Sequence, residues 1–164
     1  MVDPWDFSYL LNAIYWSHKS HDEQTKCGCC IAAKDHTIIS FGYNGFIRNI
    51  DDTDLPKTRP DKYPYMIHAE ANALLNSLRQ GKSTLNATAY ITGKPCVSCL
   101  QFMWQAGIDR VIYTDYSKPK MVEDQDKIFD KIIQKTNLDI EFVPYKEIIK
   151  IIKVKVEEEE NNNV

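Results

Sequence analysis

Hydrophobic residues in the first part of the chain recur at two spacings, and each spacing predicts a different element. Across residues 4–17 they return every three or four positions, as at Leu10 and Ile14, which is the period of a helix with one apolar face. Asp3, followed by a proline, supplies an N-cap and a suitable first helical residue. Residues 27–33 and 37–43 are short runs rich in β-formers around a polar turn, and they predict an antiparallel hairpin.

Helical and strand patterns follow one another from His68 onwards. Leu74, Leu75 and Leu78 are predicted to form the apolar face of a helix that begins at His68 and ends before Gly81. The alternation after this helix implies parallel strands joined by right-handed crossovers. We therefore expect a three-layer α/β/α fold, in which a central mixed five-stranded sheet has helices on both faces. The later segments are strands at 87–92, 110–114 and 139–143, and helices at 96–106, 123–135 and 145–153.

The length of 164 residues suits a single domain. We expect that domain to span residues 1–153. Residues 154–164 form an acidic and polar tail that has little to bury, and the sequence predicts that it is disordered. Residues 46–64 show no hydrophobic period, and an unstructured loop of that length in a compact domain is usually a lid or a binding loop.

Composition narrows the class of protein. A hydrophobic fraction of 43% and a charged fraction of 26% are typical of soluble globular domains. No apolar run is long enough to span a membrane, and the start lacks the basic segment of a signal peptide, so we expect a cytosolic protein without a membrane partner. A net charge of −3 argues against a large nucleic-acid interface, whereas a small anionic substrate needs only one or two local cations.

One histidine and two cysteines have the spacing of an open metal site. Cys96 and Cys99 lie three residues apart at the predicted start of a helix, where both can face one ion and the helix dipole favours thiolates. His68 supplies a third ligand and leaves the fourth tetrahedral position to water, as in catalytic zinc sites. A purely structural zinc clip, or two buried cysteines, would leave Glu70 and Pro95 without a role.

Glu70 is the group available for proton transfer. Zinc lowers the pKa of its bound water to roughly 7, and a carboxylate beside that water can accept a proton and pass it to a ring nitrogen and a leaving amine. The pattern H-x-E followed by P-C-x-x-C is the signature of zinc-dependent nucleobase deaminases.

Three further cysteines, Cys27, Cys29 and Cys30, allow two interpretations. They could form a second metal site, with His18, His21 and His36 as additional ligands, or they could be small buried side chains. We favour the second interpretation, because the spacing of these histidines matches no familiar zinc pattern. One zinc ion per chain is therefore expected, without a second structural ion.

Five short motifs stand out along the chain: Thr25-Lys26-Cys27-Gly28, Gly42-Tyr43-Asn44-Gly45, Tyr63-Pro64-Tyr65, His68-Ala69-Glu70-Ala71-Asn72-Ala73 and Pro95-Cys96-Val97-Ser98-Cys99. Together they resemble the deoxycytidylate deaminase family, and the resemblance covers roughly residues 5–145. It implies a cytidine-deaminase-like fold and the hydrolysis of dCMP to dUMP, with zinc held by His68, Cys96 and Cys99 and protons moved by Glu70.

The same resemblance implies substrate contacts. Asn44 would bind the deoxyribose, Arg79 would face the phosphate, and Ala69 would belong to the binding motif. Tyr116 and Lys118 follow a predicted strand in the segment that closes over nucleotide in relatives. The alternatives are a simple turn residue for Asn44, a solvated cation for Arg79, and ordinary loop packing for Tyr116.

Oligomerisation and regulation also follow from the resemblance alone. Members of the family are often hexamers activated by dCTP and inhibited by dTTP, so we expect a homo-oligomer, although the regulatory residues could not be matched. The chain departs from the usual pattern at Cys27, at Gly93 and at Phe46-Ile47-Arg48, which lacks a common proline.

Competing functions share part of the motif. A cytidine or deoxycytidine deaminase would have the same zinc site. A deaminase of polynucleotides, such as tRNA, should have a basic aromatic channel, whereas residues 50–61 are acidic. A zinc module without enzymatic activity would not need Glu70.

Overall fold

A computed structural model describes residues 2–119 and 123–162 of the chain. Its sheet has the strand order β2-β1-β3-β4-β5, in which β1 is antiparallel to both neighbours and β3, β4 and β5 are parallel. The predicted mixed five-stranded sheet is confirmed. The elements in chain order are α1 (Pro4–Ser17), β1 (Gly28–Ala32), β2 (Ile38–Tyr43), α2 (Ala69–Arg79), β3 (Thr88–Ile91), α3 (Val97–Gln105), β4 (Arg110–Thr114), α4 (Glu123–Lys135), β5 (Asp139–Val143) and α5 (Tyr145–Asn162).

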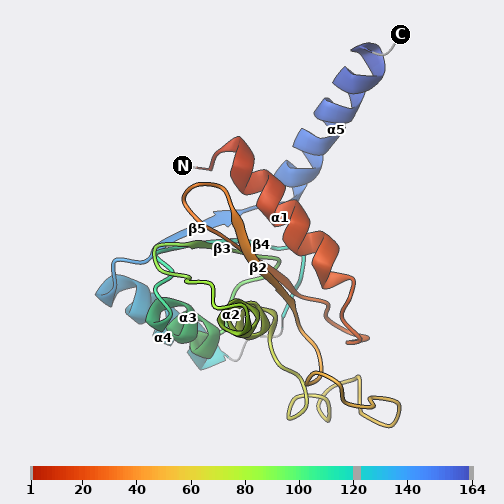
Figure 1. Cartoon of the computed structure of the whole chain (residues 1–164), viewed down its shortest axis with the longest axis vertical. Coiled ribbons are helices and arrows are strands. Elements are labelled where there is room, and N and C mark those ends of the chain that lie inside the picture. Colours follow the sequence, from red (N-terminus) through yellow and green to blue (C-terminus); the bar gives the residue numbers. More distant parts are fainter. Residues whose placement is uncertain (1, 120–122, 163–164) are drawn as a thin grey trace.

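Helices cover both faces of this sheet. Figure 1 shows α1 and the start of α5 on one face and α2, α3 and α4 on the other. Two hydrophobic cores fill the spaces between these layers, one around Leu10 and Ile148 and the other around Leu100 and Met103. The three-layer α/β/α prediction is therefore confirmed. No helix within the described residues is long and apolar enough to cross a membrane.

The first helix begins as its sequence predicts. The carboxylate of Asp3 accepts hydrogen bonds from the backbone N–H groups of Trp5 and Asp6, at 2.8 and 3.0 Å. The Asp6 carboxylate in turn accepts from the backbone N–H of Asp3 at 2.9 Å, which completes a capping box. Both ends of this exchange satisfy N–H groups that the helix itself cannot pair.

Strand directions bring several loops to one edge of the sheet. Because β1 is antiparallel to β2 and β3, the carboxyl ends of β2 and β3 lie beside the start of β1. The Thr92 hydroxyl after β3 accepts from the backbone N–H of Gly28 at 2.9 Å, and the Thr92 N–H donates to the Gly28 carbonyl at 3.1 Å. Ligands of α/β proteins usually bind at this carboxyl edge, so the loops that meet here are the place to look for a site.

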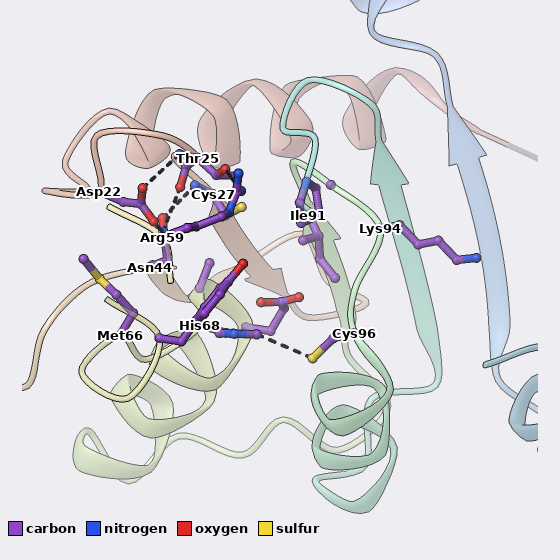
Figure 2. A pocket seen from close by; sticks show the side chains of 15 residues that line it. Asp22, Thr25, Cys27, Asn44, Arg59, Met66, His68, Ile91, Lys94 and Cys96 are labelled. Carbon is purple, nitrogen blue, oxygen red and sulfur yellow. Dashed lines mark hydrogen bonds between the residues drawn. The ribbon is translucent and has the colours of Figure 1, made fainter. Parts of the chain in front are cut away.

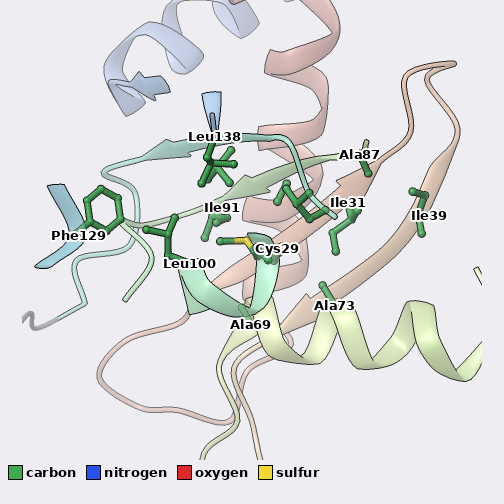
Figure 3. Packing of buried hydrophobic residues seen from close by; sticks show 14 residues of the cluster. Cys29, Ile31, Ile39, Ala69, Ala73, Ala87, Ile91, Leu100, Phe129 and Leu138 are labelled. Carbon is green, nitrogen blue, oxygen red and sulfur yellow. The ribbon is translucent and has the colours of Figure 1, made fainter. Parts of the chain in front are cut away.

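The predicted apolar face of α2 is wrong for two of its three leucines. Leu75 and Leu78 are 48% and 73% exposed, and only Leu74 packs against the core. The helix buries Ala69 and Ala73 instead, and Figure 3 shows both facing the sheet. The reason is the close approach of β2 to the helix. A Cβ atom added to Gly42 would lie 2.2 Å from the Ala69 carbonyl oxygen, so only small side chains fit between the two elements.

The last helix is longer than its periodicity suggested. We expected a helix over 145–153 and a disordered tail over 154–164, but α5 continues to Asn162 and projects from the body of the protein (Figure 1). Lysine and glutamate are good helix formers, so a polar composition that cannot fill a core can still extend an existing helix. Residues 163–164 lie outside the described part of the chain.

Cys29 and Cys30 are core residues on opposite faces of β1. Both are fully buried, Cys29 in the core beside α2 and α3 and Cys30 in the core beside α1. This alternation is the normal two-residue period of a strand. The preferred interpretation, small buried side chains, is confirmed for these two residues.

Candidate metal centre and substrate pocket

The metal-ligand candidates sit at the first turns of two helices. His68 is the N-cap of α2 and Cys96 is the N-cap of α3, yet neither side chain makes a capping hydrogen bond. Both side chains are consequently free to bind a ligand. Cys99 lies in the first turn of α3, where the N-terminal end of the helix dipole stabilises negative charge.

The separation of the three donor atoms fits a single tetrahedral ion. The Nδ1 atom of His68 lies 3.5 Å from the sulfur of Cys96 and 3.4 Å from that of Cys99. Zinc bonds of about 2.3 Å to sulfur and about 2.05 Å to nitrogen, at an angle of about 109°, would separate nitrogen from sulfur by about 3.6 Å. No other group of three histidine, cysteine or acidic side chains in the described residues has its donor atoms so close together. These three residues therefore form a site for one metal ion.

Burial and hydrogen bonding shift the pKa values around this site. Hydrogen bonds from Cys99 and His68 hold the pKa of Cys96 well below that of an ordinary thiol. Desolvation raises the pKa of Glu70, which is only 6% exposed. The pKa of His68 is raised chiefly by its hydrogen bond to Cys96. Of these three groups, only Cys96 is shifted towards its anionic form, a thiolate where a cation would bind, and the carboxyl group of Glu70 lines the same pocket.

A pocket opens beside the metal-ligand candidates. We call His68, Glu70, Cys96 and Cys99 the donor wall; the first three of them line the pocket directly. A second group of lining residues comes from the segments before β1, after β2 and within residues 46–66, and we call it the loop wall. Its members are Asp22, Thr25, Asn44 and Arg59. Figure 2 shows this group at one end of the pocket and His68 with Cys96 at the other.

A buried ion pair joins the segments of the loop wall. The amine of Lys62 lies 2.6 Å from each carboxylate oxygen of Asp22, and both side chains are 3% exposed. Asp22 also accepts the backbone N–H groups of Gln24 and Thr25, at 2.8 and 2.9 Å. The two charges are therefore paired and hydrogen-bonded, which is the condition for burying them at tolerable cost.

Asn44 is fixed by the same network. Its side-chain oxygen accepts the backbone N–H of Cys27 at 2.7 Å, and its amide nitrogen donates to Asp22 at 3.1 Å and to the Thr25 carbonyl at 2.9 Å. These contacts set the orientation of the amide. They leave one lone pair of the oxygen free to accept a hydrogen bond from a ligand.

The structure brings some of the predicted substrate contacts to the pocket and leaves others outside it. Asn44 and Ala69 line it beside the metal-ligand candidates. Arg79 is exposed in the last turn of α2 and lines a different groove. Tyr116 and Lys118 border a third hollow, and the Tyr116 hydroxyl hydrogen-bonds with His18 at 3.0 Å.

Sequence reasoning missed Asp22, Lys62 and Arg59. Nothing in their spacing pairs Asp22 with Lys62, which lies forty residues further along the chain. The available signal was weaker: residues 46–64 were expected to form a functional loop, but neither Arg59 nor Lys62 within that loop was singled out. Lys62 precedes the Tyr63-Pro64-Tyr65 motif directly, and that position could have drawn attention to it.

An α/β/α fold with two cysteines and a histidine at two helix starts, beside a buried glutamate, defines a metal-site protein of the deaminase type. The family model of the cytidine and deoxycytidylate deaminase zinc-binding region matches residues 3–115. The chain belongs to this zinc-binding family.

Curated relatives agree with this assignment, and a solved structure shares the fold. A probable deoxycytidylate deaminase of Drosophila melanogaster is 35% identical over 120 residues, which cover 66% of this chain and 58% of that protein. A probable deoxycytidylate deaminase of Caenorhabditis elegans is 32% identical over 145 residues, covering 86% of this chain and 68% of that protein. The dCMP deaminase of cyanophage S-TIM5, in complex with dCMP and dUMP, shares the fold with a TM-score of 0.72 at 23% identity, over 87% of this chain and all of that one.

Proposed function

We propose that this protein is a hydrolase that deaminates dCMP to dUMP and releases ammonia, which would supply dUMP for thymidylate synthesis. The observation that carries the proposal is the placement of buried Glu70 in one pocket with His68 and Cys96. Membership of the family and relatives named deoxycytidylate deaminase support the choice of reaction.

Each group in the pocket has a chemical task in this proposal. The chemistry that zinc supplies, when held by His68, Cys96 and Cys99, is the activation of water as a nucleophile at neutral pH. Glu70 would carry one proton of the attacking water to the ring nitrogen as the water oxygen adds to C4, and would then carry the second proton from the new hydroxyl group to the amine, which leaves as ammonia. Burial of Glu70 keeps bulk water from competing for these protons.

Asn44 and Ala69 are the substrate contacts of the proposal. Asn44 presents an oriented amide oxygen that suits a sugar hydroxyl, because its other hydrogen bonds hold it in place. Ala69 contributes a small, fully buried surface next to His68. Tyr116 and Lys118 lie outside the pocket, and their predicted closing over the nucleotide stays a prediction.

A homo-oligomer, possible dCTP activation and dTTP inhibition, and a cytosolic location belong to the same proposal. The exposed Leu75 and Leu78 support the oligomer, because with Ile47 and Ile50 they border a surface groove. Apolar side chains gathered in this way commonly mark an interaction surface.

Ammonia release from dCMP, deoxycytidine, cytidine, cytosine and a tRNA, measured in parallel, tests the proposal. We expect dCMP to be the best substrate. As a control, Cys96→Ala should lose both bound zinc, measured by elemental analysis, and turnover. Full zinc content in that variant would show that the ligand set is wrong, and equal turnover of dCMP and deoxycytidine would favour a nucleoside deaminase.

A further inference from the structure

Among the described residues, Arg59 and Lys94 are the arginine and lysine side chains that line the pocket, and Lys62 is bound to the lining residue Asp22. Lys62 is paired with Asp22 in the buried contact described above. The amine of Lys94 lies 2.6 Å from Asp126 and 4.4 Å above the centre of the Phe129 ring, and Figure 2 shows the side chain extending away from the other labelled residues. Of these three cations, Arg59 has no carboxylate partner among the described residues.

The guanidinium of Arg59 is held in place, but not all of its N–H donors have hydrogen-bond acceptors. One terminal nitrogen donates to the Thr25 hydroxyl, while the backbone N–H of Arg59 donates to the Gln24 side chain at 2.7 Å. Its Nε atom is buried and has no hydrogen-bond partner within residues 2–119 and 123–162. A buried N–H without a partner is an unfavourable arrangement, and a bound acceptor would remove it.

The position of Arg59 in the pocket indicates which part of a ligand it would meet. If the proposed function is correct, the base lies at the donor wall, because its amine is the group that leaves. The sugar and the 5′-phosphate then extend towards the loop wall, where Figure 2 places Arg59 beside Thr25 and Asn44. The nearby carboxylate of Asp22 is neutralised by Lys62, so it does not repel an anion there.

Arg79 is a poor alternative within one chain. An α-helix rises about 1.5 Å per residue, which puts the backbone of Arg79 roughly 16 Å from that of His68 along α2. The groove that Arg79 lines does not include the metal-ligand candidates.

We propose that Arg59 binds the 5′-phosphate of the substrate and thereby determines the preference for a nucleotide over a nucleoside. A guanidinium can meet a phosphate with two parallel charge-assisted hydrogen bonds. This inference rests on the proposed function for the identity of the substrate. It transfers phosphate recognition from Arg79, where the resemblance had put it, to a residue of the loop wall.

Arg59→Ala and the matched control Arg79→Ala test this assignment. We expect Arg59→Ala to lower kcat/KM for dCMP by about 10- to 100-fold and to change that for deoxycytidine by less than about threefold, as expected when one charged contact is lost. Arg79→Ala should change both by less than about threefold. Arg59→Lys keeps the charge but loses the two parallel N–H donors of the guanidinium. Its kcat/KM for dCMP should therefore lie between that of wild type and that of Arg59→Ala.

Binding of the product measures phosphate recognition apart from turnover. Calorimetry should show that wild type binds dUMP more tightly than deoxyuridine, and that Arg59→Ala removes most of this difference. Equal losses for dCMP and deoxycytidine in Arg59→Ala, or a loss specific to dCMP in Arg79→Ala, would overturn the assignment. If wild type bound dUMP through Arg59 but released no ammonia from dCMP, the inference would stand and the proposed reaction would fail.

Discussion

The donor wall and the loop wall face the same pocket but are built in different ways. The donor wall places its groups in the first turns of α2 and α3, and both helices pack on the sheet. The loop wall gathers its groups from three irregular segments and joins them through the Asp22–Lys62 ion pair. Packing of regular elements fixes the first wall, whereas buried charge fixes the second.

Because the two walls are built differently, they should respond differently to substitutions. Metal binding and proton transfer need atoms placed to within a fraction of an ångström, and sites on helices provide that accuracy. Loops can recognise the rest of a ligand, and they accept changes in length and sequence more readily than helices do. Substitutions in the donor wall should therefore affect chemistry, and substitutions in the loop wall should affect selectivity and stability.

The largest effect is expected from Glu70→Gln in the donor wall. Glutamine keeps the size of the side chain but cannot accept the proton, so kcat should fall by at least about 100-fold. Zinc content, measured by elemental analysis, should be unchanged, because Glu70 is not one of the three donors. Retained turnover in the zinc-loaded variant would remove Glu70 from the reaction and weaken the distinction between the walls.

Lys62→Met, which removes the ion pair that holds the loop wall, should reduce stability. The substitution leaves the Asp22 carboxylate buried without its counter-ion, which typically costs about 3–5 kcal/mol. Chemical denaturation measures the loss. Lys94→Met is the matched control, because its partner Asp126 is 55% exposed and such pairs contribute about 1 kcal/mol or less. Equal losses in both variants would mean that the ion pair does not hold the loop wall together.

The pH dependence of stability gives a smaller effect from the same pair. Desolvation alone would raise the pKa of Asp22, but hydrogen bonds from Lys62, Thr25 and Gln24 outweigh it and hold the pKa below its ordinary value of 3.8. A carboxyl group whose pKa is lowered by folding stabilises the protein above its unfolded pKa, and that contribution disappears as the pH falls through the folded pKa.

Wild type should consequently lose stability as the pH is lowered from about 5 towards about 3, and Asp22→Asn should show a shallower slope. Urea denaturation at a series of pH values measures this slope, independently of any constant loss that the substitution causes. An unchanged slope in Asp22→Asn would assign the acid sensitivity to other carboxylates.

Local spacing was enough to predict the donor wall and the order of helices and strands along the chain. Cys96 and Cys99 are three residues apart and His68 lies 28 residues before Cys96, which is a characteristic spacing, and alternating elements force parallel pairing. The buried face of α2 could not be predicted in this way, because it depends on the close approach of Gly42 in another strand. Hydrophobicity alone selects leucines for the interior, but here the available space selects alanines.

The loop wall could not be predicted from the sequence for a related reason. Asp22 and Lys62 meet only after the loop folds back on the segment before β1, and a charged residue in a sequence gives no sign that it will be buried. The assignment of the phosphate contact to Arg79 rested on resemblance and stays a prediction, which the comparison of Arg59→Ala with Arg79→Ala tests.

The three thiols near β1 allow the metal centre to be monitored by alkylation. Burial raises the pKa values of Cys27 and Cys30 to about 12 and that of Cys29 well above that of an ordinary thiol. At neutral pH these residues contain almost no thiolate, which is the form that reacts with iodoacetamide. Cys96 is half-buried and its pKa is lowered, so its thiolate would be shielded by a bound ion and would react with the reagent without it, whereas Cys99 is buried. The mass of the labelled native protein would therefore report directly what fraction of a preparation has lost its metal.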